Sequence, residues 1–352
     1  MSRSLLLAAL SLSLSTVVFA DDEAKTSLAQ VRENPNDVTT LRNYLNAELR
    51  AVAVSMVSDP DAALQRIDEL EKVAAELKPE TPAAKSVVSS LKSVVKTYRN
   101  RIRIQKSPYA PLAEQTSAIA RIYRSNPDEA AAKLDALKEA LAKAKESSDG
   151  KEFGDVLESL GTNVAAVERS ITAGKRQVEL IGQDAAPLKI ETWVNGPPVT
   201  DADLKGKVVF LDFWAVWCGP CIATFPHLKE WNEKYADKGL VMIGVTKYYN
   251  YKWDEDAKKA IRIDEDDEKI SPAAEQAMLV KFAESYGLKH RFGIQPDSTL
   301  ADYYGVTGIP HVVVIDQQGK IRLMKVGSGE ENAQAIGEML DKLLGSASTG
   351  GE

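Results

Sequence analysis

The feature that most constrains the fold is a change of pattern near residues 182–187. Residues 25–182 are rich in Ala, Leu, Glu and Lys at helical spacing and lack runs of alternating β-branched residues. Beyond this point, short apolar runs that suit strands alternate with helical patterns. The chain has 352 residues, more than the roughly 100–200 that are typical of one domain. We therefore predict an all-α domain over residues 21–185 and an α/β domain over residues 186–347.

Three Asx-Pro pairs predict helix starts in the N-terminal part: Asn34-Pro35, Asp59-Pro60 and Asn126-Pro127. In each pair the first side chain can cap a helix and the proline suits the first helical position. Further breaks predict five or six amphipathic helices in hairpins or a small bundle, at residues 78–82, 107–111 and 147–154. This part contains no cysteine or histidine. A dimerisation platform, a substrate-recruiting arm and a spacer toward a membrane stay equally open as its role.

The C-terminal part predicts a central mixed sheet flanked by helices. A buried strand at 208–214, a helix at 222–237 and a second apolar strand at 240–245 indicate a parallel crossover unit. The remaining elements are a strand at 190–194, a helix at 272–286, a strand at 290–294, a hairpin of 312–315 with 321–326, and a closing helix at 331–344. Residues 247–271 combine aromatic residues with an acidic cluster, and we predict that this insertion is a solvated loop or mobile lid.

The first twenty residues are typical of a secretory signal peptide. Arg3 supplies the positive start, Leu5–Leu14 is an apolar stretch, and Ala20 precedes an acidic pair that begins at Asp21. An uncleaved anchor is the alternative, but the apolar run is shorter than the roughly 20 residues that span a bilayer. We expect residues 1–20 to be removed, residues 348–352 to be a disordered tail, and the protein to act in the periplasm or elsewhere outside the bacterial cytoplasm.

The charge balance argues against nucleic acid as a partner. The chain has 44 Lys and Arg residues against 51 Asp and Glu residues, which gives a formal net charge of -7. A molecule of this charge has no overall attraction for a polyanion or for an anionic lipid surface.

The only two cysteines, Cys218 and Cys221, follow a predicted buried strand and begin a predicted helix. A helix N-terminus favours thiolate over thiol, and the nucleophile of such a pair can have a pKa of about 3.5–7.5. We expect Cys218 to attack a substrate disulfide and Cys221 to resolve the mixed disulfide, with no cofactor beyond this redox-active pair. A stabilising disulfide would close too small a loop to contribute much, and a zinc site would lack the usual four ligands.

The segment Trp217-Cys218-Gly219-Pro220-Cys221 resembles the active-site motif of the thioredoxin superfamily. The resemblance extends over residues 187–346, and Pro226 and the insertion are similar to the exported TlpA and ResA-like branch. It implies a disulfide reductase or isomerase that acts on exported proteins, to which the predicted N-terminal helical domain is an addition. It also implies electrons supplied by a membrane thiol donor.

The resemblance implies further site residues. Asp212 matches the buried carboxylate that exchanges a proton with the resolving thiol, because desolvation raises the pKa of a carboxyl in a sheet. Pro310 matches the cis proline that faces the sulfurs. We expect the substrate to contact Trp217, Gly219, Pro220, Thr307, Gly308, Ile309 and Pro310, whereas Trp214 and Phe213 should lie in the core.

His311 keeps two other functions open. Its imidazole could tune the thiolate, or could hold copper together with Cys218 and Cys221 in a copper or haem-maturation module. A peroxiredoxin-like thiol peroxidase is the third possibility, although no Thr lies three residues before Cys218 as that motif requires. If the protein is a thiol-disulfide oxidoreductase, no metal ion is expected at the site.

Overall fold

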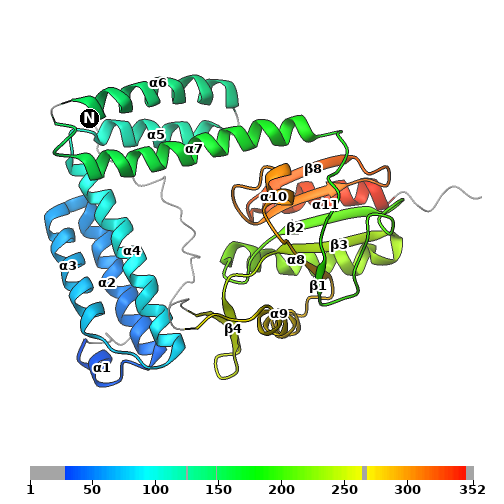
Figure 1. Cartoon of the computed structure of the whole chain (residues 1–352), viewed down its shortest axis with the longest axis horizontal. Helices are drawn as coiled ribbons and strands as arrows, with labels where there is room; N and C mark the ends of the chain where they lie inside the picture. Colours follow the sequence, from blue (N-terminus) through cyan, green and yellow to red (C-terminus); the bar gives the residue numbers. More distant parts are fainter. Residues whose placement is uncertain (1–27, 124–125, 148, 264–267, 346–352) are drawn as a thin grey trace, which may run out of the picture.

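The structure is a computed structural model that describes residues 28–123, 126–147, 149–263 and 268–345. The predicted signal peptide, the predicted tail and most of the acidic cluster lie outside these residues. Figure 1 shows a helical N-terminal part and an α/β C-terminal part, with one long helix running from the first to the second. None of the described helices has the length and apolar character needed to cross a membrane.

Seven helices, more than the predicted five or six, make up the described N-terminal part: α1 (Leu28–Glu33), α2 (Val38–Ser58), α3 (Pro60–Glu76), α4 (Pro82–Lys106), α5 (Ala110–Ile122), α6 (Pro127–Glu146) and α7 (Gly154–Leu180). The predicted caps at Asp59 and Asn126 are confirmed, because their side chains accept the backbone N–H groups of Ala62 and Glu129. The three predicted breaks are also confirmed, and the all-α class of this part holds.

The predicted helix start at Asn34-Pro35 is wrong. Helix α1 ends at Glu33, and α2 begins only at Val38. Asp37 caps α2 by accepting the N–H groups of Thr39 and Thr40, whereas Asn34 accepts the N–H of Asn36 in a tight turn. Asn and Asp side chains stabilise turns as well as helix N-termini, so an Asx-Pro pair alone cannot distinguish a turn from a helix start.

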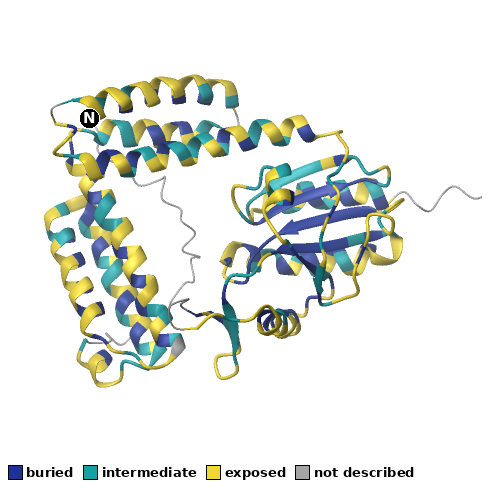
Figure 2. Cartoon of the chain, in the orientation of Figure 1, coloured by how far each residue is buried: buried dark blue, intermediate teal, exposed yellow. Residues whose placement is uncertain are grey.

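The helices bury two separate apolar clusters rather than one. Helices α1 to α3 and most of α4 share the first, which includes Leu41, Ile67 and Leu91. The last turn of α4 joins α5, α6 and α7 around the second, which includes Leu137 and Leu160. Figure 2 shows the resulting pattern, in which each helix carries a buried stripe and an exposed face. Helix α4 thus connects two small helical packs.

The C-terminal part contains a six-stranded mixed sheet, as predicted. Its strands are β1 (Thr192–Val194), β2 (Val208–Phe213), β3 (Leu240–Thr246), β6 (Arg291–Ile294), β7 (His311–Ile315) and β8 (Ile321–Val326), in the spatial order β1-β6-β3-β2-β7-β8. Strands β2, β3 and β6 run parallel, and β1, β7 and β8 pair antiparallel to their neighbours. All six residues of β2 are buried, because the strand is covered on both faces and paired on both edges.

Helices cover both faces of this sheet. Side chains of α8 (Gly219–Tyr235), α9 (Pro272–Tyr286) and α11 (Glu330–Leu344) pack on one face together with Phe210 and Val314. On the other face, the short helix α10 (Thr299–Tyr303) and the end of α7 pack with Leu211 and Val313. The turn η1 (Ala236–Lys238) connects α8 to β3. Helix α10 was not predicted, because five residues are too few to show a helical period.

The insertion is a folded hairpin, so the predicted loop is wrong. Strands β4 (Tyr251–Asp254) and β5 (Lys259–Arg262) pair antiparallel in a second, two-stranded sheet. The buried side-chain amide of Asn250 donates to the backbone oxygens of Ile263 and Glu268, and its side-chain oxygen accepts the N–H of Ile270. The aromatic residues pack on the main core. Each strand has only four residues, which is too short for an alternation of apolar and polar residues to stand out in this aromatic and acidic segment.

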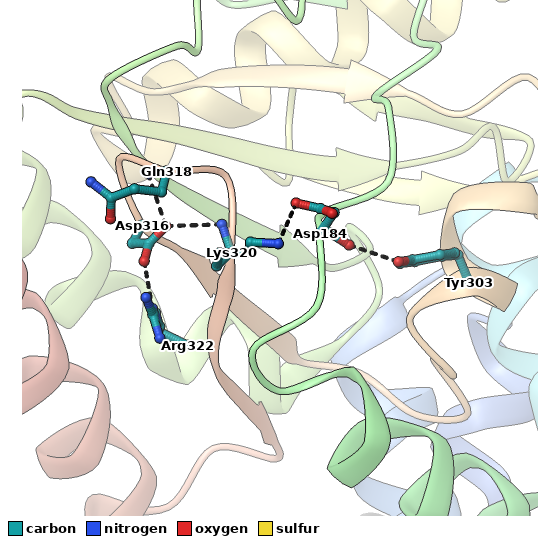
Figure 3. Close-up of polar contacts among 6 residues, drawn as sticks. All are labelled: Asp184, Tyr303, Asp316, Gln318, Lys320 and Arg322. Atoms are coloured by element: carbon teal, nitrogen blue, oxygen red, sulfur yellow. Dashed lines mark hydrogen bonds and ion pairs between the residues drawn. The ribbon is translucent and has the colours of Figure 1, made fainter.

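The long helix α7 is fixed to the α/β part at its C-terminal end. Gln177 donates to the backbone oxygen of Gly305, and the Arg176 guanidinium lies 5.3 Å from the centre of the Tyr303 ring. Figure 3 shows the next attachment, where Tyr303 donates to the backbone oxygen of Asp184 and the Asp184 carboxylate pairs with Lys320.

Buried Asp316 stabilises the turn between β7 and β8, to which the segment after α7 is bonded. Its carboxylate accepts backbone N–H groups of Gln318 and Lys320 and the Nε–H of Arg322, as Figure 3 shows. Backbone bonds from Gly182 and Ala185 to the same turn complete the attachment. The proposed boundary at 185/186 therefore falls within a segment that is tied to the sheet, and the independence of the two parts stays a prediction.

We expect Asn250→Ala to loosen the insertion. The substitution removes three side-chain hydrogen bonds at a residue with a φ of 63°, where Asn is favoured over Ala. Hydrogen exchange at the Ile270 amide should accelerate about 10- to 100-fold, the effect of losing about 1.5–3 kcal/mol of local stability. The exposed helical residue Asn163 offers a control, since Asn163→Ala should leave this exchange rate unchanged. An unchanged rate in Asn250→Ala would contradict the role given to Asn250.

Candidate active site

The two cysteines lie at the junction of β2 and α8. Strand β2 ends at Phe213, and Cys218 is the N-cap residue of α8, with Pro220 in the first turn. A disulfide joins Cys218 to Cys221, whose Cα atoms are 5.2 Å apart. The Cys221 N–H donates to the Cys218 sulfur at 3.1 Å. The sulfur of Cys218 thus occupies the place that a capping oxygen takes in other helices.

The two sulfurs differ from their neighbour Trp217 in exposure. Cys218 is 3% exposed and Cys221 is fully buried, whereas Trp217 is 50% exposed. Gly219 and Pro220 are exposed on the first turn of α8. At this end of α8 the Trp217 ring is therefore far more accessible than either sulfur.

The loop of Thr307–Pro310 lies at the same end of the sheet as the disulfide. Phe213 pairs with His311 in antiparallel register, so the residue before His311 lies beside the residue after Phe213. The Ile309–Pro310 peptide bond is cis, and Ile309 packs on the cluster that contains both cysteines. Thr307 and Gly308 are exposed, whereas Pro310 is buried. The sequence-predicted substrate residues therefore come together around the disulfide.

Asp212 lies in the middle of the sheet on the face that carries the cysteines. Its neighbours in alternation, Phe210 and Trp214, belong to the same cluster as Cys221. Asp212 is 1% exposed, and neither carboxyl oxygen has a hydrogen-bond partner among the described residues. Burial raises the pKa of the Asp212 carboxyl from 3.8 to about 7. This group therefore changes charge near neutral pH.

His311 does not share that face. The His311 and Phe213 rings meet edge to face at 5.8 Å, and Phe213 belongs to the cluster on the side of the sheet opposite to α8. Burial lowers the pKa of His311 to about 4, so the imidazole is neutral at pH 7. No group of three or more His, Cys, Asp and Glu side chains in the described chain is arranged to hold a metal ion. The position of His311 thus gives no support to a copper site shared with the cysteines.

The core around the site depends on the missing side chain of Gly244. Trp214 is 2% exposed and packs against Phe225, Phe282 and Phe292, which confirms the predicted core position of Trp214. A Cβ atom on Gly244 would lie 2.7 Å from the Trp214 ring nitrogen. Glycine therefore lets the indole pack over β3 beneath the turn that carries the cysteines. Phe213 is also buried, as predicted.

Sequence reasoning missed the residues that join the insertion to the site. The ring centres of Tyr249 and Trp217 are 5.5 Å apart at an interplanar angle of 90°. Buried Glu275 on α9 accepts the backbone N–H groups of Tyr249 and Asn250. The aromatic composition of the insertion was a signal for Tyr249. Glu275 gave none, because it is one of many acidic residues in helical segments.

A model of the Redoxin family matches residues 182–340. The thiol-disulfide oxidoreductase ResA of Bacillus thuringiensis (strain Al Hakam) is 30% identical over 163 residues, which are 46% of this chain and 78% of ResA. The chain belongs to the ResA/TlpA-like branch of the thioredoxin superfamily. ResA of Bacillus subtilis (strain 168) is 26% identical over 167 residues, which are 47% of this chain and 78% of that protein.

Membership in this branch confirms the predicted family and identifies the chain as a thiol-disulfide oxidoreductase. A solved thiol:disulfide interchange protein of Chlorobium tepidum TLS is 20% identical and superposes with a TM-score of 0.35, covering 46% of this chain and 97% of that protein. The family model begins after the end of α7 at Leu180 and so covers none of the N-terminal helices.

We expect Asp212 to make the stability of the oxidised protein depend on pH. Between about pH 4 and pH 7 the folded protein keeps the proton on this carboxyl while the unfolded chain loses it, so stability falls as the pH rises. The loss is up to about 4 kcal/mol across this window. Asp212→Asn should remove this component from denaturant unfolding followed by tryptophan fluorescence. The control Asp237→Asn, at an exposed position, should keep the wild-type pH dependence.

Proposed function

We propose that the protein reduces or isomerises disulfides of other proteins through the dithiol and disulfide forms of Cys218 and Cys221. The Cys218 thiolate bonds to one substrate sulfur, and the other substrate sulfur leaves as a thiolate. The Cys221 thiolate then attacks the Cys218 sulfur and releases the second substrate thiolate. Two electrons pass to the substrate, which takes up two protons, and a thiol donor restores the dithiol.

The observation that carries this proposal is the position of Cys218 at the N-cap of α8. The positive end of the helix and the N–H of Cys221 both face its sulfur. These groups stabilise a negative sulfur, so Cys218 is the better attacking and leaving group of the two. Cys221 is fully buried and therefore suited to internal resolution.

Asp212 supplies the proton acceptor for the resolving thiol in this proposal. Its carboxyl lies on the face of the sheet that carries Cys221, and its raised pKa of about 7 suits a base that works near neutral pH.

The substrate chain binds beside the cis proline in this proposal. Within the described residues, Thr307, Gly308 and Ile309 form no backbone–backbone hydrogen bond outside regular elements. Their free N–H and C=O groups can pair with an extended substrate segment across the disulfide, as in strand addition. Trp217, Gly219 and Pro220 then border the same segment.

We propose the location and the electron supply on the basis of the sequence and of the family resemblance. The apolar pattern of residues 1–20 supports export to the periplasm or another extracytoplasmic space, and the resemblance to the exported branch supports a membrane thiol donor. Fractionation of cells that express the full chain tests the first proposal. Recovery of the protein in the cytoplasm with residues 1–20 still attached would contradict it.

We expect the two cysteine variants to differ in a defined way. Cys218→Ser should lower insulin reduction in the presence of dithiothreitol to the rate of dithiothreitol alone, because no attacking sulfur remains. Cys221→Ser should instead accumulate a covalent adduct with the substrate, visible by non-reducing electrophoresis and released by excess dithiothreitol. Substantial activity in Cys218→Ser would overturn the proposed function.

The second half of the reaction should depend on pH through Asp212. Only the deprotonated carboxylate accepts a proton, so the rate of product release should rise between pH 6 and pH 8 with a midpoint of about 7. Asp212→Asn should flatten this profile and slow release at pH 8 about 10- to 100-fold, measured by rapid quenching of the mixed disulfide. A wild-type profile in the variant would show that Asp212 is not the acceptor.

A further inference from the structure

Tyr249 borders the surface through which a substrate reaches the attacking sulfur. Its ring meets that of Trp217 edge to face, with centres 5.5 Å apart. Trp217 is half exposed, whereas the adjacent Cys218 is only 3% exposed. A sulfur this enclosed reacts only with a segment pressed closely onto its surroundings. Where the insertion approaches Cys218, this surface consists of the rings of Trp217 and Tyr249.

The position of Tyr249 is fixed from a helix. The Glu275 carboxylate, on the first turn of α9, accepts the N–H of Tyr249 at 2.6 Å and the N–H of Asn250 at 3.1 Å. Glu275 is 3% exposed, so both hydrogen bonds to its charge are shielded from water. The Asn250 side chain is in turn hydrogen-bonded to the backbone of Ile263 and Ile270, at the other end of the insertion. The ring of Tyr249 is therefore preorganised beside Trp217.

A positive charge stands at the edge of this aromatic pair. The Lys247 ammonium lies 5.5 Å from the centre of the Tyr249 ring, and the Lys247 side chain is exposed. An aromatic ring that already faces a cation attracts a second one less, and the two cations repel each other. The surface beside Trp217 thus suits an uncharged apolar group better than a basic one.

We propose that Trp217 and Tyr249 form a binding surface for an apolar side chain next to the substrate's disulfide, with Lys247 disfavouring a basic side chain there. This inference rests on the function proposed above and adds its substrate preference. Glu275 is a positioning residue, since it acts through the backbone of Tyr249. An apolar side chain that docks here removes the exposed part of the Trp217 ring from water.

Two cyclic peptide disulfides that differ only in Leu or Lys beside one cysteine test the inference. With dithiothreitol as reductant, the full-length protein should reduce the leucine peptide with a kcat/KM about fivefold higher, the size of one good aromatic contact. Tyr249→Ala should lower the ratio of the two kcat/KM values below that of the wild type, with Trp217 and Lys247 left to supply what remains, and Tyr249→Phe should keep the wild-type ratio. A wild-type ratio in Tyr249→Ala would overturn the inference.

Variants of Glu275 test the positioning role. Glu275→Ala should lower the ratio of the two kcat/KM values as Tyr249→Ala does, and Glu275→Gln, which keeps one acceptor oxygen, should partly restore it. Tyr44→Ala removes a half-buried tyrosine from α2 and should keep the wild-type ratio. If Glu275→Ala fails to fold by circular dichroism, the ratio in Glu275→Gln decides: an unchanged ratio counts against the positioning role.

The same experiment separates this inference from the function on which it rests. A wild-type protein that reduces both peptides equally well overturns the binding surface and leaves the redox function intact. A wild-type protein that reduces neither peptide above the rate of dithiothreitol alone overturns both.

Discussion

The site depends on the burial of strand β2 between two neighbours and two layers of helices. Because every residue of β2 is buried, the strand has no freedom to shift, and the turn that follows it has a fixed starting point. Helix α8 begins at the end of that turn, so the Cys218 sulfur is held at a helix N-terminus by the register of the sheet. The position of the pair thus follows from the packing and register of β2.

The same burial imposes a cost on the sheet. Asp212 faces an apolar cluster with no hydrogen-bond partner among the described residues, which is an unfavourable place for an ionised carboxyl. The protein meets this cost by holding the carboxyl protonated up to about pH 7. In the role proposed for Asp212, stability and proton transfer are therefore opposed, because the ionised form that would accept a proton is the form that weakens the fold.

Sequence patterns predicted the parts of the fold that depend on local periodicity. Strands β2 and β3 and the β7–β8 hairpin were predicted within one or two residues, and Cys218 was correctly placed at the start of a helix. The insertion was not, because its fold depends on hydrogen bonds from Asn250 to residues 13 to 20 positions away. Such bonds leave no period in the sequence. Glu275 was missed for the same reason, since its partners lie on a different element.

The insertion connects features that the sequence placed in separate domains. Tyr249, at the start of the insertion, contacts Trp217. Strand β5 of the insertion contacts helix α4. A cavity of about 690 Å³ lies between the hairpin and α2, and its lining includes Arg42 and Lys259. Helix α7 attaches the helical part at a second point, through Gln177 and Gly305. Two separated attachments restrict the rotation that a single linker would allow. The N-terminal helices are therefore held next to the element that borders the disulfide, which a flexible spacer would not achieve.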